Sequence, residues 1–208
     1  MNYLMTSREE FWNARWLDPS YNYKDLTVNE NLAEYVQFIN ENFDNQTVFS
    51  HGCGSGRIEK LLSEKNKVVL NDISEHARAF AEKGDNQDIF ISNMEQRTSF
   101  NFDHLISHRV LHGCPNYEAI LENLLNALLD TGFISFRSIK CAEHDGVRNP
   151  VIHRDKFIKF FEVGELNDLI MYKGFAIIEN GFFEELSARR RKKNTYEYFV
   201  IKKLRDTR

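Results

Sequence analysis

The chain has 208 residues, of which 42% are hydrophobic and 28% are charged, as in a globular domain with a substantial core. Its net charge of −4 gives no global basic field, which argues against a general nucleic-acid-binding protein. No apolar run reaches the roughly 18 residues of a membrane span, and Met1–Glu10 lacks the apolar core of a secretory signal. The 3 scattered cysteines show no C-x-x-C pair, which fits a reducing cytoplasm better than a disulfide framework.

The N-terminal segment is predicted to be helical. Helices are expected at 7–16 and at Asn31–Phe43, with a loop at 17–26. Ser7 followed by Glu10 is a capping box that begins the first helix. The apolar side of this helix carries Phe11, Trp12 and Trp16. These aromatic side chains either cover an edge of the core or form a lid over a ligand pocket.

The remaining elements alternate between strands and helices. Strands are predicted at 47–51, 67–71, 88–92, 104–107, 133–139, 175–183 and 195–203. Helices are predicted at 56–64, from Ser74 to near Gly84, from near Pro115 to a stop at Asp130-Thr131-Gly132, and at 163–172. This alternation predicts an α/β fold with a mostly parallel sheet covered on both faces. No helix separates the last two strands, so they are expected to form an antiparallel hairpin.

A glycine-rich turn follows the strand Thr47–His51 and reads Gly52-Cys53-Gly54-Ser55-Gly56. Glycines allow a sharp turn and let a ligand approach the main chain closely. A second apolar strand follows and ends at Asp72. A strand, a glycine turn, a helix, a second strand and then an acid is the general pattern for binding a nucleoside ribose.

The G-x-G-x-G spacing, together with the elements after it, resembles class I S-adenosylmethionine-dependent methyltransferases. The first motif of that family reads acid-x-Gly-x-Gly-x-Gly, and its glycines match Gly52, Gly54 and Gly56. The chain departs from the motif at Ser50, where the family has an acid that helps to hold the methionine end of the cofactor. The resemblance extends from about residue 45 to the C-terminus.

The resemblance implies a Rossmann-like sheet of seven strands in the order 3-2-1-4-5-7-6, with strand 7 antiparallel and helices on both faces. It also implies a methyltransferase domain at 45–208, a helical lid segment at 1–44 and an insertion at about 140–158 over the acceptor site. The cofactor is expected to be S-adenosyl-L-methionine.

The cofactor-binding residues that this resemblance implies are His51, Gly52, Cys53, Gly54, Gly56, Asp72, Ile73, Asn93, Met94 and His108. Asp72 is expected to accept hydrogen bonds from the ribose hydroxyls. The alternative is that it is a turn aspartate that caps the next helix. The side-chain carbonyl of Asn93 is expected to accept a hydrogen bond from the adenine amino group, with Met94 beside the adenine ring. The alternative there is a turn asparagine next to a core methionine.

Two histidines follow the strand 104–107 and are the candidate catalytic residues. His108 and His112 are candidates for a general base, which would give the pH–rate profile an ascending limb near the imidazole pKa. The alternative is that both are structural. A metal site made of these histidines and Cys114 is not expected, because the spacing matches no closed zinc pattern.

The acceptor is expected to contact Trp12, Arg15, Arg137 and His144. Basic residues are concentrated after the fifth strand: Arg137, Lys140, His144, Arg148, His153 and Arg154. They form either a solvated loop or a cap that favours an anionic substrate. The basic run Arg189–Asn194 is interpreted as a charged loop that keeps a sheet edge soluble, or as a contact for an RNA backbone or a phosphorylated partner.

These features together predict an S-adenosylmethionine-dependent methyltransferase that acts on an O or N atom of a small molecule, with an anionic acceptor favoured. One alternative is a cofactor-binding interaction module that has lost catalysis, which the missing acid at Ser50 favours. Another is a methyltransferase that acts on RNA. No membrane partner is expected, and the oligomeric state is not predicted.

Overall fold

The structure is a computed structural model that describes residues 7–18, 29–62, 64–80, 87–91, 94, 99–147, 159–186 and 193–204. Helix α1 (Arg8–Leu17) begins at Ser7, whose hydroxyl accepts a hydrogen bond from the backbone N–H of Glu10 at 3.2 Å. The Glu10 carboxylate accepts in return from the backbone N–H of Ser7, also at 3.2 Å. The predicted capping box is therefore confirmed. Helix α2 (Glu30–Asn42) is capped by Asn29 and begins one residue before the predicted range.

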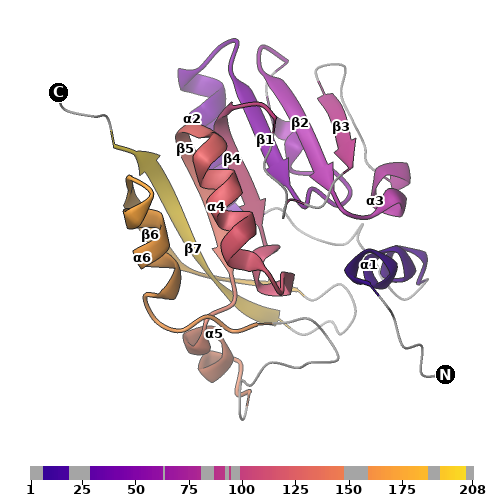
Figure 1. The fold of residues 1–208 in the computed structure, drawn as a ribbon, viewed down its shortest axis with the longest axis vertical. Helices are drawn as coiled ribbons and strands as arrows, with labels where there is room; N and C mark the ends of the chain where they lie inside the picture. Colours follow the sequence, from indigo (N-terminus) through magenta and orange to yellow (C-terminus); the bar gives the residue numbers. More distant parts are fainter. Residues whose placement is uncertain are drawn as a thin grey trace.

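The strands of the described residues form a single sheet. They are β1 (Thr47–His51), β2 (Lys67–Asp72), β3 (Gln87–Ile91), β4 (Phe102–His108), β5 (Leu128–Phe136), β6 (Phe175–Leu186) and β7 (Lys193–Lys203). Their order is β3-β2-β1-β4-β5-β7-β6, with β1 to β5 parallel and β7 antiparallel to both of its neighbours (Figure 1). The mixed, mostly parallel α/β sheet predicted from the sequence is confirmed.

The two faces of the sheet bury separate apolar clusters. Alternate residues of each strand point to opposite faces, so Val48 packs with α2 while Phe49 packs with α4 (Tyr117–Ala127). Helix α6 (Glu165–Tyr172) joins the α4 side. Helix α1 lies beside α3 (Glu75–Phe80), at the edge where β1 and β2 end (Figure 1). The carboxyl ends of the central strands are therefore surrounded by loops and by α1, and not by α2 or α4.

The prediction of a helix at 56–64 is wrong in both helix type and length. Only a 3-10 helix, η2 (Glu59–Leu61), follows the glycine turn, and Leu62 is already extended. A segment this short is helical only if packing supports it. Leu61 is exposed and the buried side chain on η2 is Glu59, so the three residues of η2 contribute no apolar side chain to the core, whereas Ile58 and Leu62 beside them do.

The boundary between the longest core helix and the fifth strand also differs from the prediction. Helix α4 ends at Ala127, and β5 begins at once with Leu128, which pairs with Phe102. Gly132 is not a helix stop but a strand residue. A Cβ there would lie 3.2 Å from side-chain atoms of Leu105 and Ile201, so the glycine permits close packing inside the sheet.

Three elements extend into stretches that were predicted as loops. Helix α5 (Ile139–His144) lies in the segment after the fifth strand that was expected to be polar loop. The hairpin of β6 and β7 is longer than predicted, because pairing continues to Leu186 and Lys193. A short 3-10 helix, η3 (Leu111–Gly113), follows β4. No helix in the described part of the chain has the length and apolar character needed to cross a membrane.

Candidate functional site

The glycine turn at the end of β1 has the left-handed backbone that its sequence requires. Gly52, Gly54 and Gly56 have φ values of 69°, 56° and 68°. Asp72, at the end of β2, fixes the turn: one carboxylate oxygen accepts from the Gly54 backbone N–H at 3.0 Å, and the other accepts from the Ser74 N–H at 2.9 Å. The turn is therefore preformed by a carboxylate of the neighbouring strand.

Two elements pack directly on this turn. A Cβ at Gly52 would lie 2.4 Å from a methyl carbon of Val110, in the segment after β4. A Cβ at Gly54 would lie 3.2 Å from the Trp16 ring on α1. Helix α1 is held there by Asn13, whose side-chain oxygen accepts from the Ser74 hydroxyl at 2.6 Å. The turn thus joins α1 on one side to the segment after β4 on the other.

A buried carboxylate lies beside the position that lacks the motif acid. The hydroxyl of Ser50, on β1, donates to the Glu59 carboxylate, and the two residues are 1% and 2% exposed. Burial raises the pKa of Glu59 to about 6; the hydrogen bond from Ser50 lowers it, and the charge of Asp72 raises it further. The sequence prediction treated Ser50 as an acid lost from the site, but the structure supplies an acid from η2.

This buried carboxylate should make stability depend on pH. The Glu59 pKa rises from 4.5 in the unfolded chain to about 6 in the folded chain, so the folded state binds the proton more tightly. The free energy of unfolding is therefore highest below about pH 4.5 and decreases as the pH rises through about 6. We expect Glu59→Gln to remove this loss, so the stability of the variant relative to wild type should rise by about 2 kcal/mol between about pH 4 and pH 7.5. Urea unfolding at both pH values measures this difference. Glu64→Gln, at an exposed position, is the control, and equal pH dependence in the two variants would contradict the assignment.

A second polar cluster begins directly after β4. Both ring nitrogens of His108 face protein groups: Nδ1 is 3.0 Å from the Ser135 hydroxyl and Nε2 is 3.2 Å from a Glu185 oxygen. Arg109 adopts a left-handed φ of 64°, which is uncommon for a residue with a side chain, and its guanidinium pairs with Glu185. Its backbone N–H donates to the Ser135 carbonyl at 3.1 Å and approaches the Ser135 hydroxyl to 3.0 Å. These contacts hold the backbone of Arg109 in its left-handed conformation.

Two guanidinium groups and one imidazole lie around the ring of Tyr196, on β7. The guanidinium carbons of Arg109 and Arg137 lie 4.8 and 5.9 Å from the ring centroid, and the His112 ring centroid lies 5.8 Å away. Burial, followed by the charges of Arg109 and Arg137, lowers the pKa of His112 to about 3. Within the described residues, no hydrogen-bond partner reaches the buried Nδ1 of His112 or the buried Nε of Arg137.

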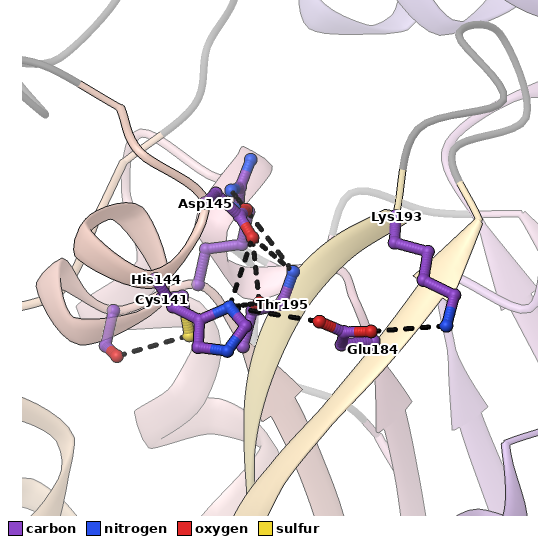
Figure 2. A network of polar contacts seen from close by, with 8 residues as sticks. Cys141, His144, Asp145, Glu184, Lys193 and Thr195 are labelled. Atoms are coloured by element: carbon purple, nitrogen blue, oxygen red, sulfur yellow. Dashed lines mark hydrogen bonds and ion pairs between the residues drawn. The ribbon is translucent and has the colours of Figure 1, made fainter.

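A polar network joins His144 and Asp145, at the end of α5, to Thr195 and Glu184 on the hairpin (Figure 2). Asp145 is 5% exposed on its side chain and pairs with Arg137. It also accepts from the Thr195 backbone N–H at 3.0 Å and from the Thr195 hydroxyl at 2.8 Å. His144 lies at the outer side of the network, 61% exposed, with Nδ1 2.8 Å from the Thr195 hydroxyl. Asp145 therefore fixes Arg137 against β7, whereas His144 faces outward.

The comparisons with known proteins agree with this geometry. Residues 49–136 match the family model described as methyltransferase domain. The matched segment, which is less than half of the chain, is therefore similar to a methyltransferase domain. Such a domain implies S-adenosylmethionine as the cofactor and supports enzymatic activity. No curated protein matches the chain by sequence.

Solved structures share the methyltransferase fold at low sequence identity. A magnesium protoporphyrin IX methyltransferase from Synechocystis PCC 6803 with bound S-adenosylhomocysteine is 16% identical, with a TM-score of 0.69 over 94% of this chain and 98% of that chain. A 1,6-didemethyltoxoflavin-N1-methyltransferase from Burkholderia thailandensis is 16% identical, with a TM-score of 0.67 over 95% and 87%. An S-adenosylmethionine-dependent methyltransferase from Methanosarcina mazei is 19% identical, with a TM-score of 0.63 over 86% and 99%.

The predicted cofactor-binding residues lie mainly at one edge of the sheet. His51, the glycine turn with Cys53, Asp72 and the half-buried Ile73 are gathered where β1 and β2 end. Both carboxylate oxygens of Asp72 accept backbone N–H groups, as a turn aspartate would. A carboxylate has about four acceptor positions, so ribose binding by Asp72 stays a prediction. Met94 is buried in the core cluster on the α4 side, and Asn93 lies outside the described residues.

The predicted catalytic and acceptor residues of the domain are divided between several places. His108, His112 and Arg137 are close to Tyr196 and Glu185, whereas Trp12 and Arg15 lie on α1, half-buried. His144 is largely exposed and contacts the Thr195 hydroxyl. The predicted basic residues Arg148, His153 and Arg154 and the run 189–192 lie outside the described residues.

Sequence reasoning missed Glu59, Arg109, Asp145, Glu185 and Tyr196. For Glu59 a signal existed, because a motif that lacks its acid invites a search for a nearby carboxylate. Glu185 and Tyr196 gave no local signal, since their meeting with His108 and His112 depends on the extended hairpin.

Proposed function

We propose that the chain transfers the methyl group of S-adenosylmethionine to an O or N atom of a small anionic molecule. The observation that carries this proposal is the packing of Val110 on Gly52, because it joins the glycine turn to the cluster around Tyr196. Arg109 and His112 flank Val110 in sequence, so the cofactor turn and the basic cluster share one continuous segment.

The Tyr196 cluster is suited to an acceptor with a carboxylate or a similar anionic oxygen. Arg137 presents a buried Nε that no group of the described residues accepts, and its guanidinium is already oriented by Asp145. A guanidinium pairs strongly with a planar carboxylate. The Nδ1 of His112 adds a second buried polar atom that a ligand could satisfy.

The chemistry requires little of the protein beyond positioning. When bound, S-adenosylmethionine supplies an electrophilic methyl on its sulfonium. The protein then has to hold the acceptor atom in line with that methyl and keep water out. An ionised carboxylate needs no base, which agrees with a site whose histidines are weak bases because their pKa values are lowered. Arg137 and Arg109 would orient the acceptor, and Asp145 and Glu185 would keep the two guanidinium groups in place.

The pH–rate profile distinguishes this proposal from a histidine base. Burial lowers the pKa of both His108 and His112, the latter to about 3, so both rings are weaker bases than an ordinary imidazole. We therefore expect kcat to show no ascending limb near pH 6.5, contrary to the profile of a base with an ordinary imidazole pKa. His112→Asn should raise the Michaelis constant of the acceptor more than it lowers kcat. A limb near pH 6.5 that disappears in one histidine variant would contradict this arrangement.

The alternative of an interaction module without catalysis depended on the missing acid at Ser50. The buried carboxylate of Glu59 beside that serine weakens this argument. The alternative of an RNA substrate depended on the positive charge of the basic run 189–194. One of these charges, that of Lys193, is paired with Glu184 at 3.3 Å.

A methyl-transfer assay tests the proposed function. The full chain is incubated with methyl-labelled S-adenosylmethionine and a panel of small carboxylic acids, the corresponding amides, amines, phenols and total RNA. The proposal predicts transfer to a carboxylic acid and none to its amide. Transfer to RNA alone, or transfer that is equal for acid and amide, would overturn the anionic small-molecule acceptor.

A further inference from the structure

The position of the motif acid is filled in an unusual way in this chain. Ser50 is almost fully buried on β1, and its hydroxyl donates to the carboxylate of Glu59. The backbone N–H of Lys60 donates to the Gly56 carbonyl at 3.2 Å, which turns the chain back after the glycine motif. This return brings Glu59 onto the end of β1, so a carboxylate nine positions later in the sequence hydrogen-bonds to the side chain at position 50.

The surroundings of Glu59 are acidic. The charge of Asp72 raises its pKa, after the larger effect of burial. Burial, then Glu59 and then Asp72 raise the pKa of the Cys53 thiol in the glycine turn well above its usual value. Two carboxylates therefore act on the same turn, one from η2 and one from β2. Such an environment favours a cationic ligand over an anionic one.

We propose that Glu59, oriented by Ser50, is the carboxylate that binds the ammonium group at the amino-acid end of S-adenosylmethionine. The inference rests on the proposed cofactor. Ser50 is the positioning residue, because its hydroxyl directs one carboxylate oxygen. In this assignment the chain has moved the motif acid from the strand to the 3-10 helix that follows the glycine turn. Asp72 is left to fix the turn itself.

A purely structural role is the competing explanation, in which the Ser50–Glu59 pair only braces the turn. Ligands with and without an amino-acid end separate the two explanations. S-Adenosylmethionine and S-adenosylhomocysteine carry the ammonium group, whereas 5′-methylthioadenosine carries the same adenosine and a thioether but no amino-acid end. A contact to the ammonium affects only the first two ligands, while a loosened turn affects all three.

Calorimetric titration of the three ligands into the full-length wild type and Glu59→Gln tests the proposal. We expect Glu59→Gln to weaken both ammonium-bearing ligands by about 10- to 100-fold, as for a lost hydrogen bond to a charged group, with 5′-methylthioadenosine unchanged. Equal losses for all three ligands, or no loss for any, would overturn the proposal. Circular dichroism and a melting curve confirm that the variant is folded.

The double variant Ser50→Asp with Glu59→Gln keeps the test independent of a folding defect. It returns a carboxylate to the strand position and leaves an amide at 59. We expect it to recover most of the affinity for S-adenosylmethionine that Glu59→Gln loses, and a failure to recover in a folded double variant would contradict the proposal. If wild type binds 5′-methylthioadenosine but neither of the other two ligands, the ammonium contact is wrong while an adenosine site remains. If wild type binds none of the three, the proposed cofactor itself is wrong.

Discussion

Gly54→Val is expected to abolish binding of S-adenosylmethionine and S-adenosylhomocysteine. Gly54 has a φ of 56°, where a β-branched residue is strongly disfavoured, and a Cβ there would lie 3.2 Å from the Trp16 ring. A branched side chain would occupy the space between the turn and α1 and would move the backbone N–H that Asp72 holds. We expect the affinity for both ligands to fall at least about 100-fold, to the limit of calorimetric detection.

Gly174→Val is the matched control for that variant. Gly174 also has a left-handed φ, of 80°, and it stands between α6 and β6. Apart from its chain neighbours, no atom of the residues that the structure describes lies within 4 Å of its Cβ position. It therefore reports the cost of backbone strain without an obstruction at the turn. Binding should be close to wild type in this control. A folded Gly54→Val protein with wild-type affinity would show that the ligand does not pass along the glycine turn.

Arg137→Met is expected to raise the Michaelis constant of an anionic acceptor by about 10- to 100-fold, as for a lost charge-assisted hydrogen bond. The substitution keeps much of the apolar stem but removes the guanidinium, whose central carbon lies 4.7 Å from the centroid of the Phe160 ring. Cofactor affinity should change little, because Arg137 is fixed against β7 and α5 rather than against the glycine turn. Steady-state kinetics with the carboxylic acid acceptor measures the effect.

Lys193→Met serves as the control because it removes a cation from the same network shown in Figure 2. Its partner is Glu184, and both side chains are largely exposed, so the pair should contribute little. Arg137→Lys restores the charge without the planar fork and should recover only part of the lost acceptor binding. If both Arg137 variants kept the wild-type Michaelis constant for a carboxylic acid, the Tyr196 cluster would not be the acceptor site.

The fold could be predicted from the sequence where local patterns determine it. Ser7 and Glu10 identified the start of α1, and the alternation of apolar runs with helical stripes identified the mixed sheet. The glycine turn and Asp72 were also found in this way, because each lies at a strand end and carries its own conformational signal. These features depend on neighbours in the sequence.

The remaining features depend on tertiary contacts. Leu128 fits a helical stripe and a strand equally well, and its pairing with Phe102 decides for the strand. Glu59 would ordinarily be assigned to the surface. Its burial follows from the hydrogen bond to Ser50 on β1 and from the turn that brings it there. Glu185 belongs to a part of β6 that only the pairing with β7 extends, so its contact with His108 could not be predicted from local sequence.

Titration of the full-length wild-type chain with S-adenosylhomocysteine and S-adenosylmethionine tests the central claim most directly. The match of residues 49–136 to a methyltransferase domain and the preformed glycine turn predict saturable binding of both ligands at one site per chain. Each ligand should also displace the other and raise the melting temperature with increasing concentration. A folded chain that gives neither binding heat nor a shift in melting temperature with either ligand would contradict the assignment of this site to S-adenosylmethionine.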